Sequence, residues 1–169
     1  MTIIERLRQY KELDPHKIAL IVDDKKYTYG DLYDAILSID INDTSRIVNV
    51  AQTKESPKHI VALIQSQSFV EQLVQWLGVL YTGYIPMVCH NEMDTEYVEK
   101  LARFIAYKGV VPLADFGVLT SGTTGRPKPL WRSESSWRDF FDIQNDIFHI
   151  NKDTKIFLHR SEEHTSELQ

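Results

Sequence analysis

FGVLTSGTTGRPK, residues 116–128, joins an apolar run to a segment of glycine and hydroxyl residues that ends on a lysine. The apolar run 116–119 predicts a buried strand, and Gly122 and Gly125 allow the following backbone to turn tightly. Successive backbone N–H groups in such a turn form an anion-binding concavity. Further donors are available from the side chains of Thr120, Ser121, Thr123, Thr124 and Lys128. The stretch therefore predicts a site for a polyphosphate.

The sequence of this segment also bears on two other kinds of loop. A Walker A loop requires lysine directly after the second glycine, whereas Arg126 and Pro127 intervene here. Pro127 also disfavours a helix that starts on Gly125. A hairpin turn without any ligand has the same glycine, threonine and proline content. At this point the phosphate site and the empty turn both stay open.

Length and composition limit the class of protein. A chain of 169 residues with 43% apolar and 25% charged residues predicts a soluble globular domain. The net charge of −5 and the scattered basic residues argue against nucleic-acid binding. The single cysteine, Cys89, excludes an intrachain disulfide and fits a reducing compartment. No run approaches the ~20 apolar residues of a membrane span, and the charged start is not signal-like, so we expect a cytoplasmic protein.

The apolar pattern alternates between strand-like and helix-like segments. Helical spacing predicts helices over the first dozen residues, about 30–39, about 69–83 with Ser68 as N-cap, and 96–108 with Val98, Leu101, Phe104 and Ile105 inward. Short β-branched runs predict strands at 18–22, 46–51, 60–64 and 84–88, and a shorter strand is expected at 129–131. This alternation predicts an α/β fold with a mostly parallel sheet flanked by helices.

The C-terminal part of the chain carries two further expectations. Ser133 or Ser135 is expected to cap a helix whose apolar side chains enter the core, namely Trp137, Phe140, Phe141, Ile143, Ile147 and Phe148. Residues 155–159 begin what could be another strand. Residues 160–169 resemble a translated sequencing-library adapter, so we expect them to be an artefactual tail outside the fold.

With the 120–128 motif in this context, the chain resembles the N-terminal part of the acyl-adenylate-forming enzymes, which include acyl-CoA synthetases and the adenylation domains of peptide synthetases. Residues 120–128 match the family's phosphate-loop signature almost letter for letter. Weaker matches are found at 15–20, 27–32 and 76–87, in the order of the family. The resemblance covers residues 1–159, which would be a truncated N-terminal part of the AMP-binding domain.

The resemblance implies ATP-dependent activation of a small-molecule carboxylate to acyl-AMP and pyrophosphate, with Mg²⁺ sharing the phosphate charge. CoA or the thiol of a carrier protein would then accept the acyl group. The β- and γ-phosphates would be contacted by Thr120, Ser121, Thr123 and Thr124, with Lys128 as the supporting cation. Gly122 and Gly125 would shape the backbone.

The chain departs from the family pattern in ways that limit these expectations. Pro129 stands where the family usually has glycine, and the stretch 88–114 is shorter than usual. The family's adenine, ribose and acyl pockets, its metal-contacting glutamate and its mobile lysine would follow residue 159, so we expect this fragment to be inactive alone. The histidines and Cys89 lack metal-site spacing, and no protein metal site is expected.

Two alternative functions remain open, a phosphate-binding module without adenylation and a non-catalytic remnant. Truncation is also expected to leave one face of the sheet uncovered.

Overall fold

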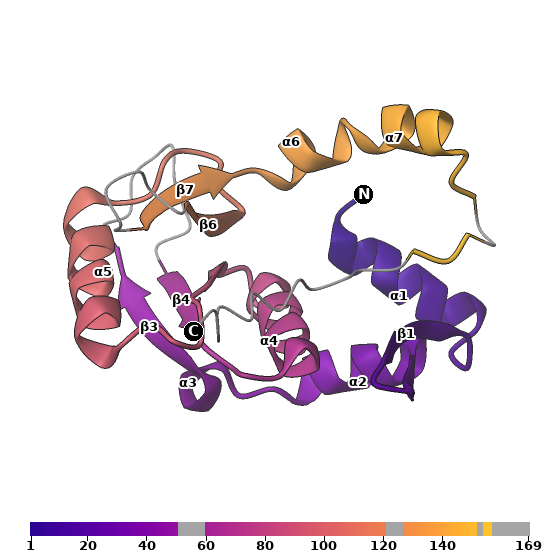
Figure 1. Ribbon diagram of the computed structural model, residues 1–169, viewed down its shortest axis with the longest axis horizontal. Helices are drawn as coiled ribbons and strands as arrows, with labels where there is room; N and C mark the ends of the chain where they lie inside the picture. Colours follow the sequence, from indigo (N-terminus) through magenta and orange to yellow (C-terminus); the bar gives the residue numbers. More distant parts are fainter. Residues whose placement is uncertain (51–59, 121–126, 152–153, 157–169) are drawn as a thin grey trace, which may run out of the picture. The chain divides into compact units, whose positions relative to one another are not determined.

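The structure, a computed structural model, describes residues 1–50, 60–120, 127–151 and 154–156. It contains two units, Met1–Trp137 and Arg138–Gln169, which are described separately below. All strands of the described residues belong to the first unit (Figure 1), in one sheet of five strands and one of two. In the described part of the chain, no helix has the length and apolarity needed to cross a bilayer.

The five-stranded sheet has its strands in sequence order. They are β3 (Ser45–Asn49), β4 (Ile60–Ile64), β5 (Ile85–Val88), β6 (Phe116–Thr120) and β7 (Lys128–Arg132). The central strands β4, β5 and β6 run parallel, and the outer strands β3 and β7 each pair antiparallel with their neighbour. The α/β class and the parallel centre of the sheet, both predicted from the sequence, are confirmed.

One face of this sheet is covered by α5 (Thr95–Lys108). Alternate residues of β4 and β5, among them Val61, Leu63 and Met87, pack against Leu101 and Ile105 of the helix. Period-two alternation puts the intervening residues on the opposite face. The helix agrees with the predicted range, but Phe104 is 48% exposed, so its predicted inward position is wrong. The buried face of α5 passes through Ala102 instead.

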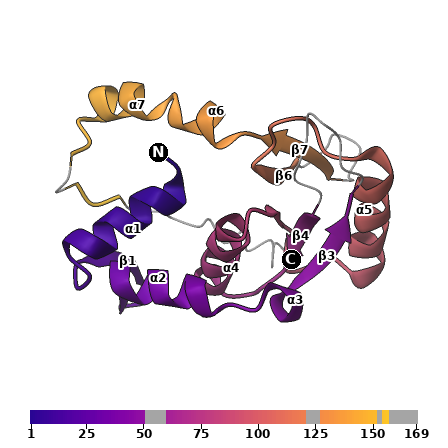
Figure 2. The same cartoon turned by 180° about the vertical axis from the view of Figure 1, so that it is seen from behind.

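The other face of the sheet is covered by α4 (Phe69–Tyr81) and α3 (Ile41–Thr44). Ala62 and Ile64 of β4 pack there with Ile41 and Val79. Figure 2 shows α4 and α5 on opposite sides of β4. The expectation of an uncovered sheet face is therefore wrong for β3, β4 and β5, since helices within residues 1–137 already cover both faces.

The N-terminal elements pack on the outer side of α4. α1 (Ile3–Leu13) and α2 (Tyr29–Ser38) form a second cluster with α4, made by Leu7, Tyr33, Ile36 and Leu77. Between the two helices, β1 (Ile18–Val22) and β2 (Lys25–Thr28) form an antiparallel hairpin. Asp23 and Asp24 turn this hairpin with φ values of 48° and 63°, as a two-residue turn requires.

The segment after β7 differs from its prediction. It forms two helices, α6 (Glu134–Arg138) and, in the second unit, α7 (Phe141–Phe148), instead of one. Ser133 does cap α6, because its Oγ accepts a hydrogen bond from the Ser136 N–H at 3.2 Å. The apolar residues predicted to be core are at least 49% exposed, namely Trp137, Phe140, Phe141, Ile143, Ile147 and Phe148. Helical spacing indicates an apolar stripe but does not supply a surface to cover it.

Candidate phosphate-binding site

The two ends of the 120–128 motif lie side by side at the end of the β6–β7 hairpin. Thr120 and Lys128 are partners across the two strands. The Thr120 hydroxyl donates a hydrogen bond to the Lys128 carbonyl oxygen at 3.3 Å. Ser121, Gly122, Thr123, Thr124 and Gly125 lie outside the described residues. The structure therefore brings together the first and last predicted site residues, and their role as phosphate contacts stays a prediction.

β6 is anchored firmly in the sheet below this end of the hairpin. The ring of Phe116 is 2% exposed and makes edge contacts with Trp76 of α4 and Trp137 of α6, at centroid distances of 5.5 and 5.0 Å. Gly117 is paired with Met87 of β5. Thr120 thus stands at the carboxyl end of a parallel strand, which is the edge where α/β sheets bind ligands.

β7 carries the lysine on an exposed strand. Lys128 alternates with Pro129, so the lysine shares its face with Leu130 and Arg132. Lys128 is exposed and forms no ion pair with any described residue. Pro129 lies opposite Leu119 in a regular pairing. β7 has no second neighbour among the described strands, and a strand in that position tolerates a proline that cannot donate.

A tyrosine from α5 contacts Pro127, at the C-terminal end of the 120–128 motif, which is called the exit of the motif below. The Tyr97 hydroxyl donates a hydrogen bond to the Pro127 carbonyl oxygen at 2.6 Å, across 30 positions of sequence. The ring of Tyr97 packs on the cluster between α5 and the sheet. Sequence reasoning missed this residue, because a tyrosine at helical apolar spacing resembles any other packing residue. Only the fold shows that it points at the motif.

The loop that leads into α5 is held by one side chain at the carboxyl end of β4. The Gln65 amide nitrogen lies 3.0, 3.3 and 2.8 Å from the carbonyl oxygens of His90, Asn91 and Met93. Asp94 then caps the helix, its carboxylate accepting from the Tyr97 N–H at 2.6 Å. In the first turn of α5, Glu96 forms an ion pair with Lys100 on the exposed side of the helix.

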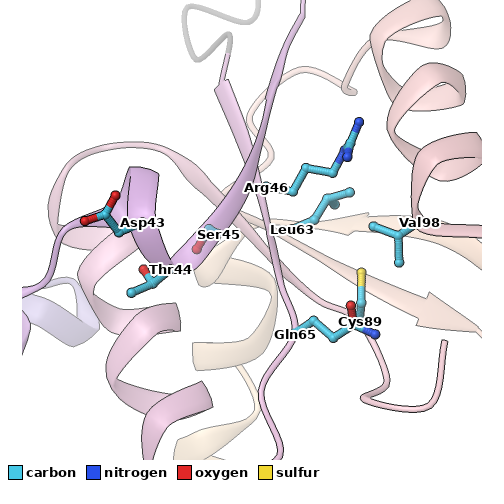
Figure 3. Close-up of a pocket in the computed structure, with 8 residues that line it drawn as sticks. All are labelled: Asp43, Thr44, Ser45, Arg46, Leu63, Gln65, Cys89 and Val98. Carbon is cyan, nitrogen blue, oxygen red and sulfur yellow. The ribbon is translucent and has the colours of Figure 1, made fainter. Parts of the chain in front are cut away.

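A separate pocket of about 240 Å³ opens beside β3 (Figure 3). Its walls come from α3, β3, β4 and α5 and from the residues that follow β4 and β5. They comprise Asp43, Thr44, Ser45, Arg46, Leu63, Gln65, Cys89 and Val98. The Ser45 hydroxyl is buried and has no hydrogen-bond partner among the described residues. Arg46 pairs with Glu99 at 2.5 Å. Thr120 and Lys128, the described ends of the motif, do not line this pocket.

Cys89 lines that pocket, but its thiol is buried and protonated. Its side chain is 0% exposed, and burial raises the pKa of the thiol to about 11. Because the thiolate is the reactive form, a thiol of this kind is a packing residue and not a nucleophile. Within the described ranges no group of three or more metal-binding side chains gathers.

Known proteins share sequence similarity with most of this chain. No protein-family model matches the chain. It is 24% identical over 179 residues to a Staphylococcus aureus protein provisionally assigned as the long chain fatty acid-CoA ligase VraA. A Staphylococcus epidermidis protein of the same assignment is 26% identical over 155 residues. These alignments cover 91% and 80% of this chain, and 36% and 32% of the relatives. The chain thus spans about a third of their length.

One solved structure shares part of the chain trace. The N-terminal subdomain of NpsA from Klebsiella oxytoca, in complex with 3-hydroxyanthranilyl-AMSN, has a TM-score of 0.48 and 16% identity. The match covers 79% of this chain and 40% of that one. The sequence relatives confirm the resemblance to acyl-CoA ligase-like, AMP-forming enzymes that the 120–128 motif predicted.

Proposed function

We propose that this chain is the N-terminal segment of an ATP-dependent ligase that activates a carboxylate as acyl-AMP and releases pyrophosphate. The observation that supports the proposal most directly is the pairing of Thr120 with Lys128, which joins the ends of the phosphate-loop signature at the carboxyl edge of a sheet. The similarity to fatty acid-CoA ligases gives independent support. By the same similarity we propose CoA as the acceptor, with a carrier-protein thiol as the alternative. We also propose a cytoplasmic location.

Among the described residues of the motif, Thr120 and Lys128 suit the handling of a leaving pyrophosphate. Lys128 offers an exposed ammonium that no described side chain neutralises. The Thr120 hydroxyl, which now donates to the Lys128 carbonyl, stands at the same end of the hairpin. When a carboxylate attacks the α-phosphorus, the bond to pyrophosphate breaks, and a cation and donors fixed where negative charge develops lower the barrier to departure of pyrophosphate. Mg²⁺, when bound, would share the charge through phosphate oxygens.

The residues of this chain account for only part of that reaction. They can orient and neutralise phosphate, but the adenine, ribose and acyl pockets that the resemblance implies would follow residue 159. We therefore propose that residues beyond 159 of a longer parent complete the site and that the fragment alone is inactive. We also propose that residues 160–169 are foreign, which genomic DNA sequence after codon 159 would test.

Pyrophosphate exchange tests the function directly. The protein, extended past residue 159 with its genomic continuation, should exchange labelled pyrophosphate into ATP only when a carboxylate such as a long-chain fatty acid is added. Lys128→Ala should weaken ATP binding about tenfold or more, since hydrogen bonds to charged groups contribute roughly 1.5–3 kcal/mol. Arg132→Ala removes an exposed cation from the same face of β7 and serves as the matched control.

The possible results separate the rival functions. ATP binding without carboxylate-dependent exchange would indicate a nucleotide- or phosphate-binding module. Absence of ATP binding in the extended protein would indicate a non-catalytic remnant. Equal effects of Lys128→Ala and Arg132→Ala would show that general charge, and not the motif, attracts the nucleotide.

A further inference from the structure

We propose that Tyr97 is a positioning residue whose hydroxyl fixes the backbone at the exit of the motif and thereby sets its affinity for a triphosphate chain. This inference rests on the proposed function, because it concerns the same site. It assigns a role to a residue of α5 that lies outside the motif. The contact that carries it is the 2.6 Å hydrogen bond from the Tyr97 hydroxyl to the Pro127 carbonyl oxygen.

The exit of the motif has few hydrogen-bond donors of its own. Pro127 and Pro129 flank Lys128, and neither proline has a backbone N–H. In the pairing with β6, Pro129 faces Leu119 and cannot donate to it. Lys128 is therefore the one residue of this three-residue segment whose main chain can donate. Because this backbone has so few donors, its conformation depends on hydrogen bonds that other parts of the chain donate to its carbonyl groups. Tyr97 donates such a bond to the Pro127 carbonyl.

Tyr97 itself is held firmly enough to act as a support. Its backbone N–H is bound by the Asp94 carboxylate at the start of α5, and its ring packs on the core cluster. The loop before Asp94 is fixed by the Gln65 amide at the end of β4. A continuous series of contacts thus runs from the centre of the sheet, through the start of α5, to the Pro127 carbonyl.

The Thr120–Lys128 contact adds a second hydrogen bond beside the predicted cation. The Thr120 hydroxyl binds the Lys128 carbonyl, one residue after the carbonyl that Tyr97 binds. The two hydrogen bonds together fix two consecutive peptide groups next to the predicted cation. Loss of the tyrosine hydroxyl would leave the lysine on the strand. It would, however, give the Lys128 backbone more conformational freedom, so the side chain would be oriented less precisely toward the anion.

Tyr97→Phe removes the hydroxyl while keeping the ring in the core. The full chain would be titrated with inorganic tripolyphosphate and Mg²⁺ by calorimetry, and amide hydrogen exchange at Lys128 and Leu130 would be followed in parallel. We expect the affinity to fall about three- to tenfold, the range of a single lost hydrogen bond, and exchange at Lys128 to accelerate. Tyr107→Phe is the matched control, because Tyr107 lies on the same helix and is 83% exposed.

The two readouts keep the inference and the proposed function apart. If the wild-type chain and its extended form both fail to bind tripolyphosphate, the phosphate role of the motif is wrong and the affinity part of the inference falls with it. If Tyr97→Phe binds as tightly as wild type, or if Lys128 exchanges at an unchanged rate, the inference is overturned even though the phosphate site stands. Exchange in β4 at Val61 should be unchanged and reports on the global fold.

Discussion

Met87 of β5 and Gly117 of β6 are partners across the parallel junction at the centre of the sheet, and the methionine methyl group occupies the space where a side chain at Gly117 would stand. A Cβ at Gly117 would also lie 2.9 Å from Cζ3 of Trp131. The glycine therefore permits β6 to approach both neighbouring strands. The strand that ends in Thr120 takes its position from this close contact.

Gly117→Ala should destabilise the chain by about 1–3 kcal/mol, the usual cost of adding atoms to a filled core. Met87 is 0% exposed and has little room to move, although a methionine side chain adapts better than most. Urea denaturation followed by tryptophan fluorescence measures the change. Combining Gly117→Ala with Met87→Ala should recover part of the loss, since the added methyl group then enters vacated space. Additive effects of the two substitutions would contradict the proposed collision.

Cys89 should make stability fall in alkaline solution. Because burial raises the pKa of the thiol from 9.0 to about 11, the folded chain holds the proton that the unfolded chain loses first. The stabilisation is thus complete below pH 9 and is lost as the pH rises to about 11, by on the order of 2 kcal/mol. Urea midpoints of wild type and Cys89→Ala, compared between pH 8 and 11, isolate this contribution. A constant difference between the two proteins would show that the thiol is not protected.

Asp31 should contribute stability that acid removes. Its carboxylate accepts from the backbone N–H and the hydroxyl of Thr28, both at 2.8 Å, and these bonds lower the pKa of Asp31 from 3.8. The contribution is therefore present above pH 3.8 and is lost as the pH falls through the lower folded-state pKa. Asp31→Asn should flatten the acid limb of the stability profile. An acid limb that stays the same in Asp31→Asn would contradict this contribution.

The apolar surface of α7 should limit solubility of the chain. Ile143, Ile147 and Phe148 are 56%, 65% and 68% exposed on one short helix. Ile147→Lys should raise the concentration at which light scattering detects aggregates, with little change in melting temperature because exposed positions contribute little to stability. Gln144→Lys adds the same charge to the helix without removing apolar surface. If both substitutions act equally, net charge is responsible and not the apolar surface.

Elements whose signals are local could be predicted from the sequence. Ser68 as N-cap and the spacing of Leu73, Leu77 and Leu80 located α4, because capping and a 3.6-residue period act within one helix. The strand pair on either side of the motif was also predicted, since the apolar run 116–119 precedes a glycine-rich turn and the short segment 129–131 follows it. These predictions needed no knowledge of the rest of the chain.

Features that depend on contacts distant in sequence could not be predicted. The direction of Tyr97 toward Pro127 depends on how α5 packs beside β6, and nothing in the spacing of α5 specifies it. Trp137 illustrates the opposite error. Its apolar character predicted burial, yet only one edge of the ring meets Phe116 and half of the side chain stays exposed. The ligand contacts of Ser121, Thr123 and Thr124 stay predictions, as these residues lie outside the described ranges.

The β6–β7 hairpin also has a consequence for the order of folding. The parallel junctions of β5 with β4 and β6 must each close a loop that contains a helix, whereas Thr120 meets Lys128 after only eight positions. Short loops close at lower entropic cost and hairpins form within microseconds, so the two flanks of the motif can pair before the sheet is complete. The Tyr97 contact spans 30 positions and must come later. Local contacts thus form the hairpin first. The final geometry of the hairpin is then set when the rest of the domain assembles around it.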